Sequence, residues 1–160
     1  MHLIGNLYLQ QNEYADALAH YQKAMIANVP DFNELDEYAN PTGESYYNAD
    51  VLLNSLLLKA RALETRHLGK TLKGRDLSEA LTALENCDHL IERIRRLRVN
   101  KRDKIALGVT AAEVYEDAIR ISLMLSDITF KKSTTGKKAF LFFRAEQGRR
   151  VTGYHFRYRC

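Results

Sequence analysis

The first thirty residues carry the pattern that most restricts how this chain can fold. Between Leu3 and Pro30, apolar and small side chains recur at helical spacing, and the pattern breaks once, at 11–12. Two short helices joined by a tight turn are therefore expected. Small residues stand where the helices would have to approach closely, and tyrosines stand beside them; the set is Gly5, Ala17 and Ala24 with Tyr8, Tyr14 and Tyr21. A hairpin this small cannot bury its apolar face alone, so the pattern predicts stacking on further hairpins.

The same spacing returns later in the chain. The set Ala80, Leu84 and Cys87 repeats the interval of Ala17, Tyr21 and Ala24. We therefore expect an all-α chain whose residues 1–150 form one helical-repeat domain. Its hairpins are expected at about 1–29, 46–98 and 103–150, with a loop at 30–45 and an irregular tail at 151–160. The helix at 46–68 is apolar around most of its circumference, which predicts burial on two sides.

The connections between helices carry local signals of their own. The glycine-containing stretch 69–75 is expected to be a loop. Asp76, with Glu79 three residues later, is expected to be the N-cap of the helix that follows. In the loop at 30–45, Leu35 and Tyr38 are expected to pack against the first hairpin.

Composition excludes several classes of protein. The chain has 160 residues, of which 46% are hydrophobic and 28% are charged, so it is long enough to bury a core as one domain. Two prolines and eight glycines are too few for a β protein with many turns. The sequence has no apolar run of about 18 residues and no signal segment, which predicts a cytoplasmic protein. Two cysteines are too few for a disulfide framework.

The first hairpin resembles a tetratricopeptide repeat. The positions that match the repeat's small residues, aromatics and closing proline are Gly5, Tyr8, Ala17, Tyr21, Ala24 and, one residue late, Pro30. The resemblance implies hairpins stacked in a right-handed superhelix and a non-enzymatic scaffold that binds a protein or peptide on the face made by the first helix of each pair. It places partner contacts at His2, Asn6, Leu9 and Gln10.

A second resemblance rests on the order of segments. A compact repeat is followed by a leucine-rich helix, then by YEDAIRISL and AFLFFRAEQG. Over about 1–148 this order resembles the repeat region that precedes the caspase-like CHAT domain in large bacterial proteins. It implies, as an alternative function, a regulatory segment without its catalytic domain. The repeat's tryptophan position falls on Met1, so we expect a piece of a longer protein whose open end favours self-association.

The residues that could carry catalysis or bind metal are not arranged to do so. Cys87 falls on the apolar stripe of its helix and is expected to be buried. His89 lies about 200° further around the same helix, so the two side chains point to opposite faces. The other cysteine, Cys160, belongs to the irregular tail. We therefore expect no enzyme, no cofactor and no metal site.

Charge is divided unevenly along the chain. Residues 1–90 hold 7 Lys and Arg against 13 Asp and Glu, whereas residues 91–160 hold 17 against 7. Basic residues gather at Arg93, Arg95, Arg96, Arg98, Lys101, Arg102 and Lys104. The plainer interpretation is a helix C-terminus whose dipole favours cations. The alternative is a patch that binds nucleic acid or an acidic partner through Arg93, Arg96, Lys101 and Arg102. Aromatic side chains that would stack bases are missing from this stretch, so nucleic acid is the less favoured partner.

Overall fold

The chain forms helices that follow one another in space as they do in sequence. A computed structural model describes residues 1–42, 44–97 and 100–129. In these ranges the elements are α1 (His2–Gln10), α2 (Tyr14–Asn28), α3 (Ala49–Arg66), a π-helical turn η1 (His67–Thr71), α4 (Gly74–Leu97) and α5 (Lys101–Thr129), with no strand. The all-α prediction is confirmed. The second helix of the third predicted hairpin and the tail at 151–160 lie outside the described residues.

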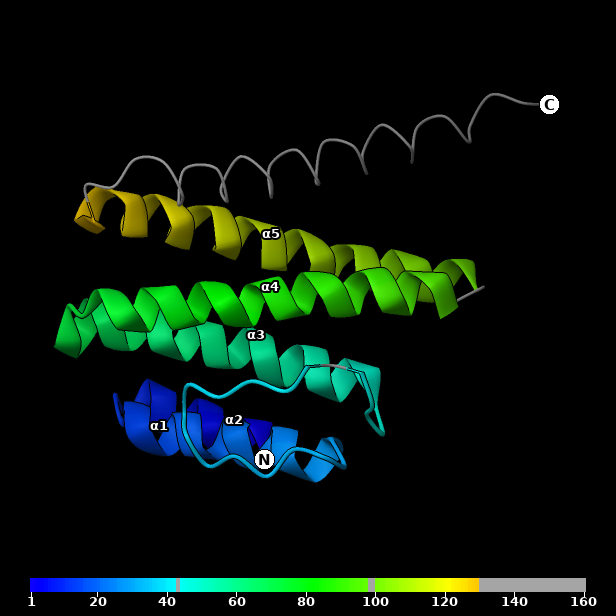
Figure 1. The fold of residues 1–160 in the computed structure, drawn as a ribbon, viewed down its shortest axis with the longest axis horizontal. Coiled ribbons are helices and arrows are strands. Elements are labelled where there is room, and N and C mark those ends of the chain that lie inside the picture. The colour runs from blue at the N-terminus through cyan, green and yellow to red at the C-terminus, as the bar shows by residue number, and fades with distance from the viewer. Residues whose placement is uncertain (43, 98–99, 130–160) are drawn as a thin grey trace.

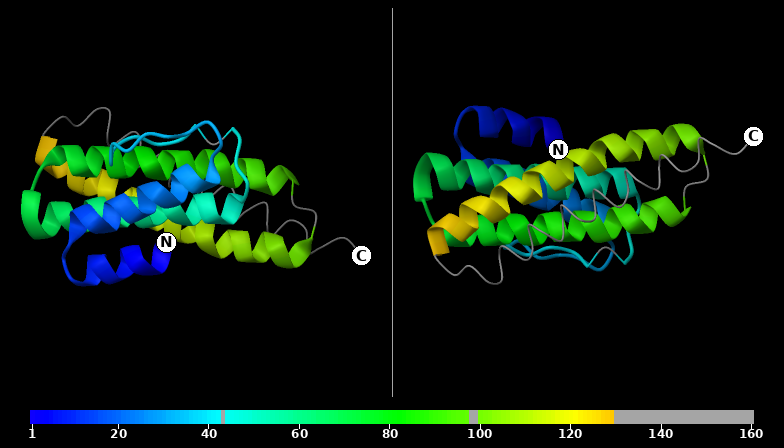
Figure 2. Two further views of the ribbon diagram at one scale, coloured as in Figure 1. Left: turned by 90° about the horizontal axis from the view of Figure 1, so that it is seen from below. Right: turned by 90° about the horizontal axis from the view of Figure 1, so that it is seen from above.

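Each helix packs on the next one in order. Figure 1 shows α1 and α2 at one side of the molecule, then α3, α4 and α5 in sequence. The central helix α3 contacts both α2 and α4, which confirms the predicted burial on two sides. The segment between α2 and α3 runs along the molecule on the side of α2 opposite to α1 (Figure 2).

The contact between α1 and α2 depends on Gly5. A Cβ atom at this position would lie 2.6 Å from Cε1 of Tyr21, so only glycine lets the two helices approach this closely. Tyr21 is fully buried, and its hydroxyl donates a 2.6 Å hydrogen bond to Oδ1 of Asn6. Burial raises the pKa of Tyr21 to about 12. The small residue and the tyrosine read from the sequence are therefore one packing unit.

The turn between α1 and α2 is made by Asn12. Its φ of 60° lies in the left-handed region, which asparagine tolerates better than most residues. The hydroxyl of Tyr14 donates a 3.0 Å hydrogen bond to Oδ1 of Asn12 and so ties the turn to the start of α2. The predicted break in the helical pattern is confirmed at this place.

The core continues through the faces of α3, α4 and α5 that meet. In α4, Ala80, Leu84 and Cys87 are fully buried, as are Ala17 and Tyr21 in α2. The prediction that Cys87 is buried is confirmed. Its thiol lies 3.9 Å from the carbonyl oxygen of Leu53 in α3.

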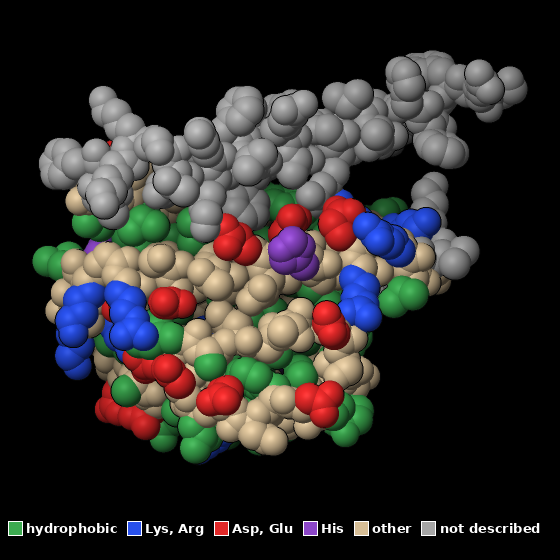
Figure 3. Space-filling model, viewed as in Figure 1, with side chains coloured by type: hydrophobic (Ala, Val, Ile, Leu, Met, Phe, Trp, Pro, Cys, Tyr) green, Lys and Arg blue, Asp and Glu red, His purple; other side chains and the backbone are tan. Residues whose placement is uncertain are grey.

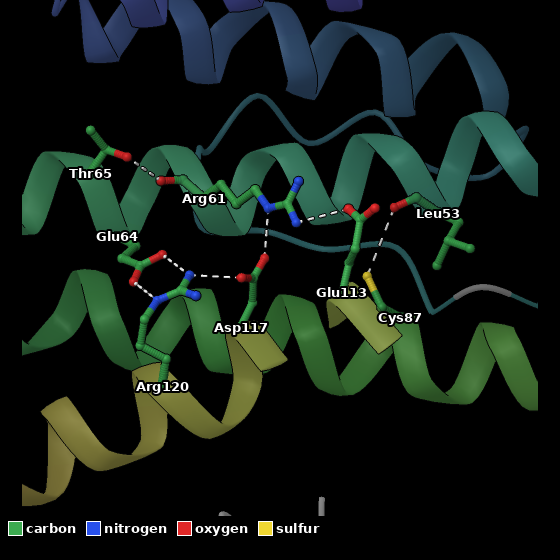
Figure 4. Close-up of polar contacts among 8 residues, drawn as sticks. All are labelled: Leu53, Arg61, Glu64, Thr65, Cys87, Glu113, Asp117 and Arg120. Carbon is green, nitrogen blue, oxygen red and sulfur yellow. Dashed lines mark hydrogen bonds and ion pairs between the residues drawn. The ribbon is translucent and has the colours of Figure 1, made fainter. Parts of the chain in front are cut away.

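A chain of ion pairs joins α3 to α5. Figure 4 shows Arg61 and Glu64 from α3 beside Asp117 and Arg120 from α5. Nε of Arg61 lies 2.6 Å from Asp117, and Nε of Arg120 lies 2.7 Å from Glu64. Arg120 also pairs with Asp117 at 2.7 Å. Because the two carboxylates are almost buried, each needs its arginine, and the network selects one register of α5 against α3.

The predicted N-cap of α4 was wrong. The helix begins at Gly74, so Asp76 lies in its first turn rather than at its cap. Its buried carboxylate accepts hydrogen bonds from Arg66, Thr71 and Tyr38 instead. The stretch 69–75 is also not a simple loop, because η1 extends α3 as far as Thr71.

The packing predicted for Leu35 was wrong, because this side chain is 78% exposed. Tyr38 is partly buried and packs on the core. Its hydroxyl also donates to Asp76 and accepts from Arg66. Sequence spacing could not show this, since both partners lie about thirty or more residues further along the chain.

Candidate partner-binding surfaces

The segment between α2 and α3 is closed at its base by two asparagines. Asn28 is the last residue of α2 and Asn48 is the N-cap of α3. Nδ2 of Asn28 donates to the carbonyl of Asn48 at 2.8 Å, and its Oδ1 accepts the N–H of Asn48 at 2.9 Å. Asn48 in turn caps α3 by accepting from the N–H groups of Asp50 and Val51. The segment therefore leaves and re-enters the helical array at one point.

Lys59 and Gln22 hold the middle of this segment. Nζ of Lys59 donates to the carbonyl of Ala39 at 2.6 Å and to Oε1 of Gln22 at 3.0 Å. The amide of Gln22 donates to the carbonyl of Glu34 at 2.8 Å. Lys59 is only 1% exposed, and burial lowers the pKa of its ammonium group to about 8. The irregular backbone of this segment is therefore held by a hydrogen bond from a buried amino group rather than by hydrogen bonds within a helix or sheet.

A second anchor lies around Tyr38. Nη1 of Arg66 pairs with Glu37 at 2.6 Å, and its Nη2 pairs with Asp76 at 2.7 Å. Burial alone would raise the pKa of Asp76, but hydrogen bonds from Arg66, Thr71 and Tyr38 outweigh it and hold that pKa below its ordinary value. The guanidinium of Arg75 stacks over the Tyr38 ring at 4.1 Å from its centroid.

Held in this way, the segment forms one wall of a groove. The groove has a volume of about 860 Å³. Its floor is apolar and includes Val29, Phe32 and Pro41, whereas Asp31 and Glu44 stand at its exposed edge. Arg93 of α4 closes the other side, and its guanidinium lies 5.9 Å from the centroid of the Tyr46 ring. A volume of this size lies within the range of ligand-binding clefts.

The outer edge of α1 is a second candidate surface. We call it the α1 edge; it consists of the exposed side chains Met1, Leu3, Ile4 and Leu7. Leu3 is 80% exposed and Leu7 is 57% exposed. Helix α1 contains no Asp, Glu, Lys or Arg. An exposed apolar edge without charges is a feature of interaction sites rather than of ordinary solvated helices.

The four residues of the first helix that were predicted to contact a partner have different environments. Nε2 of His2 lies 2.7 Å from Oγ of Ser55 in α3, and burial lowers the pKa of its imidazole. Asn6 accepts the hydroxyl of Tyr21, and Leu9 packs partly buried on the core. Gln10 is exposed. Two of the four, His2 and Asn6, therefore use a polar atom in a hydrogen bond within the fold.

The predicted basic cluster spans the end of α4 and the start of α5. Arg96 and Arg102 are exposed in this region, where Figure 3 shows blue side chains together. Arg93, one turn before Arg96 on α4, also lines the groove, and the side chain of Lys101 lies outside the described residues.

Cys87 and His89 do not face one another in the fold. Burial raises the pKa of the Cys87 thiol, and His89 is exposed on another face of α4. No set of three His, Cys, Asp or Glu side chains in the described ranges is placed to hold a metal ion. None of the helices described is both long and apolar enough to cross a membrane.

Comparisons with protein-family models, with curated proteins and with solved structures find no match for this chain. Its similarity to any repeat family therefore rests on the residues quoted above. The groove was missed in the sequence because its walls come from segments far apart. One signal was available: residues 30–48 contain five Asp and Glu and no Lys or Arg.

Proposed function

We propose that this chain is a non-enzymatic protein–protein interaction scaffold of tetratricopeptide type. The observation that carries the proposal is the α1 edge. Each of α2, α3 and α4 packs on a helix at both sides, whereas α1 packs chiefly on α2 and leaves Leu3 and Leu7 exposed. Exposed apolar side chains that gather on one edge of a helix are a feature of interaction sites.

The energetics favour a partner at this edge. Burial of apolar surface contributes roughly 25 cal/mol per Å², and α1 has no Asp, Glu, Lys or Arg side chain to desolvate. Aliphatic side chains at positions 3, 4 and 7 follow the spacing by which one helix face docks against another. A helical or repeat-containing partner fits such an edge, and a second copy of the chain fits it as well.

Finer parts of the proposal follow the resemblance. The hairpins would belong to a right-handed superhelix, and the chain would serve as the regulatory repeat region of a CHAT-type caspase-like protein or as an independent scaffold. We place it in the cytoplasm, in keeping with a free, buried Cys87. We propose no nucleic-acid partner, because Arg93 lines a groove rich in carboxylates and the basic stretch 93–104 contains no aromatic residue of its own.

Quantitative affinity capture tests the scaffold function. The wild-type chain is compared with the double variant Leu3→Glu, Leu7→Glu, and bound proteins are measured by mass spectrometry. We expect specific partners, or the chain itself, to be lost from the variant by about tenfold, since charges at the centre of an apolar interface are strongly unfavourable.

The control variant carries two leucine-to-glutamate substitutions outside the α1 edge. Leu72 and Leu97 are exposed leucines on other parts of the molecule, so Leu72→Glu, Leu97→Glu changes charge and hydropathy equally. This control is expected to keep the wild-type partners. Identical protein sets for all three chains would refute the proposal.

A further inference from the structure

The groove beside the segment 30–48 has an excess of uncompensated negative charge. Asp31, Glu34 and Glu44 line it, and all three are exposed. None of them forms an ion pair with a described residue, although Oγ of Ser45 lies 3.4 Å from Asp31. Arg93 is the only basic side chain in the described lining. Three carboxylates against one guanidinium leave a negative field at the groove edge.

The floor of the groove has a different character from its edge. Val29, Phe32 and Pro41 are buried, and they give the lining an apolar part beside its carboxylates. Asn40, Thr42 and Ser45 line the groove as well, so its lining also contains amide and hydroxyl groups.

We propose that the groove binds a peptide segment of another protein in which Lys or Arg alternates with apolar residues. The cations pair with Asp31, Glu34 and Glu44, and the apolar side chains lie on Phe32 and Pro41. The negative charge of the groove favours a cationic occupant, and its apolar floor favours one that also carries apolar side chains. Arg93 disfavours an unbroken run of cations, because it repels the nearest one.

The groove is prepared for binding before a ligand arrives. The Asn28–Asn48 pair fixes the two ends of the segment 30–48, and Lys59 holds Ala39, which lines the groove. A wall fixed by such bonds loses little conformational entropy when a peptide binds. This inference rests on the scaffold function and names a second partner site, remote in sequence from the α1 edge.

The test uses fluorescence anisotropy with pools of short synthetic peptides. The pools share the same Leu, Phe and Pro content, and one is cationic, one neutral and one acidic. The wild-type chain is expected to bind the cationic pool selectively at low salt and to lose affinity as NaCl is added. In the variant Asp31→Asn, Glu34→Gln, Glu44→Gln we expect the affinity for the cationic pool to fall by about tenfold.

A matched variant separates local from overall charge. Glu13→Gln, Asp16→Asn, Glu116→Gln removes the same charge from exposed positions outside the groove and is expected to bind like wild type. The inference is overturned if both triple variants weaken binding equally, if no pool binds, or if spermine, which lacks apolar side chains, binds as tightly as the cationic pool. It is also overturned if the groove carboxylates instead hold a second copy, seen as a dimer that the groove variant alone disperses.

The two proposals fail separately. Loss of peptide binding in every form, with partner capture still dependent on Leu3 and Leu7, refutes the groove and leaves the scaffold function standing. If peptide binds to the groove but the Leu3→Glu, Leu7→Glu variant captures the same partners as wild type, the role of the α1 edge is refuted and the groove inference stands.

Discussion

Two glycines within helices, Gly5 and Gly108, have different surroundings. Gly5 faces the ring of Tyr21, which is fully buried and held by its hydrogen bond to Asn6. Gly108, in α5, has no atom within 4 Å of the place where a Cβ would stand. Helix propensity alone predicts that alanine is more favourable than glycine at both positions.

Alanine substitution is predicted to have opposite effects at these sites. Gly5→Ala should destabilise the fold by about 1–3 kcal/mol, because α1 must move away from Tyr21 or the ring must leave its place. Gly108→Ala should stabilise it by about 0.5–1 kcal/mol. Urea unfolding of both variants beside wild type measures the difference. Equal stabilisation by both substitutions would show that α1 does not pack closely on α2.

At the same scale, the sequence predicted well the residues whose partners are close in the chain. The contact of Gly5 with Tyr21 follows from helical spacing within one hairpin. Asp76 was misassigned because a carboxylate near a helix start has the same local pattern whether it caps the helix or not. Its real partners, Arg66 and Tyr38, are brought to it by the tertiary fold.

Among the elements, the helices were predictable and the segment between α2 and α3 was not. Apolar periodicity is a property of each helix alone, so the positions of α3 and α4 could be read from the sequence to within a few residues. The segment has no period, and its order depends on Gln22 and Lys59, which lie in two different helices. A lysine inside an apolar helix gave no sign of this role.

The buried amino group of Lys59 predicts a specific dependence of stability on pH. Its pKa is about 8 in the folded chain and 10.5 in the unfolded chain, so between these values the unfolded chain binds more protons. The free energy of unfolding should therefore rise with pH, by about 1 kcal/mol between pH 8 and pH 9. The raised pKa values of Cys87 and Tyr21 act in the opposite direction, that of Cys87 from about pH 8 and that of Tyr21 from about pH 9, so the rise due to Lys59 is partly offset.

The Lys59→Met variant isolates this effect. It should lose the rise between pH 8 and pH 9, whatever its absolute stability, whereas Lys23→Met at an exposed site should keep it. Urea unfolding at closely spaced pH values measures the slope. A slope that persists in Lys59→Met would mean that another group causes it.

For the molecule as a whole, the packing of helices in sequence order was predictable, but the surfaces of the molecule were not. Small and aromatic residues at repeated spacing indicated stacked helices, and five α-helices packed in sequence are observed in the described ranges. The groove arises only when an acidic segment and Arg93 are brought together across the fold. The charge difference between the two halves of the chain was visible, yet it did not show that Arg93 and the acidic segment would meet.

Site-specific photo-crosslinking in cells tests most directly the claim that this molecule is an interaction scaffold with its partner at the α1 edge. A benzophenone amino acid replaces Leu7 in one chain and Leu72, which is more exposed and lies outside α1, in another. We predict a defined protein adduct from position 7 and none from position 72. No adduct at position 7, or the same adducts from both positions, would contradict it.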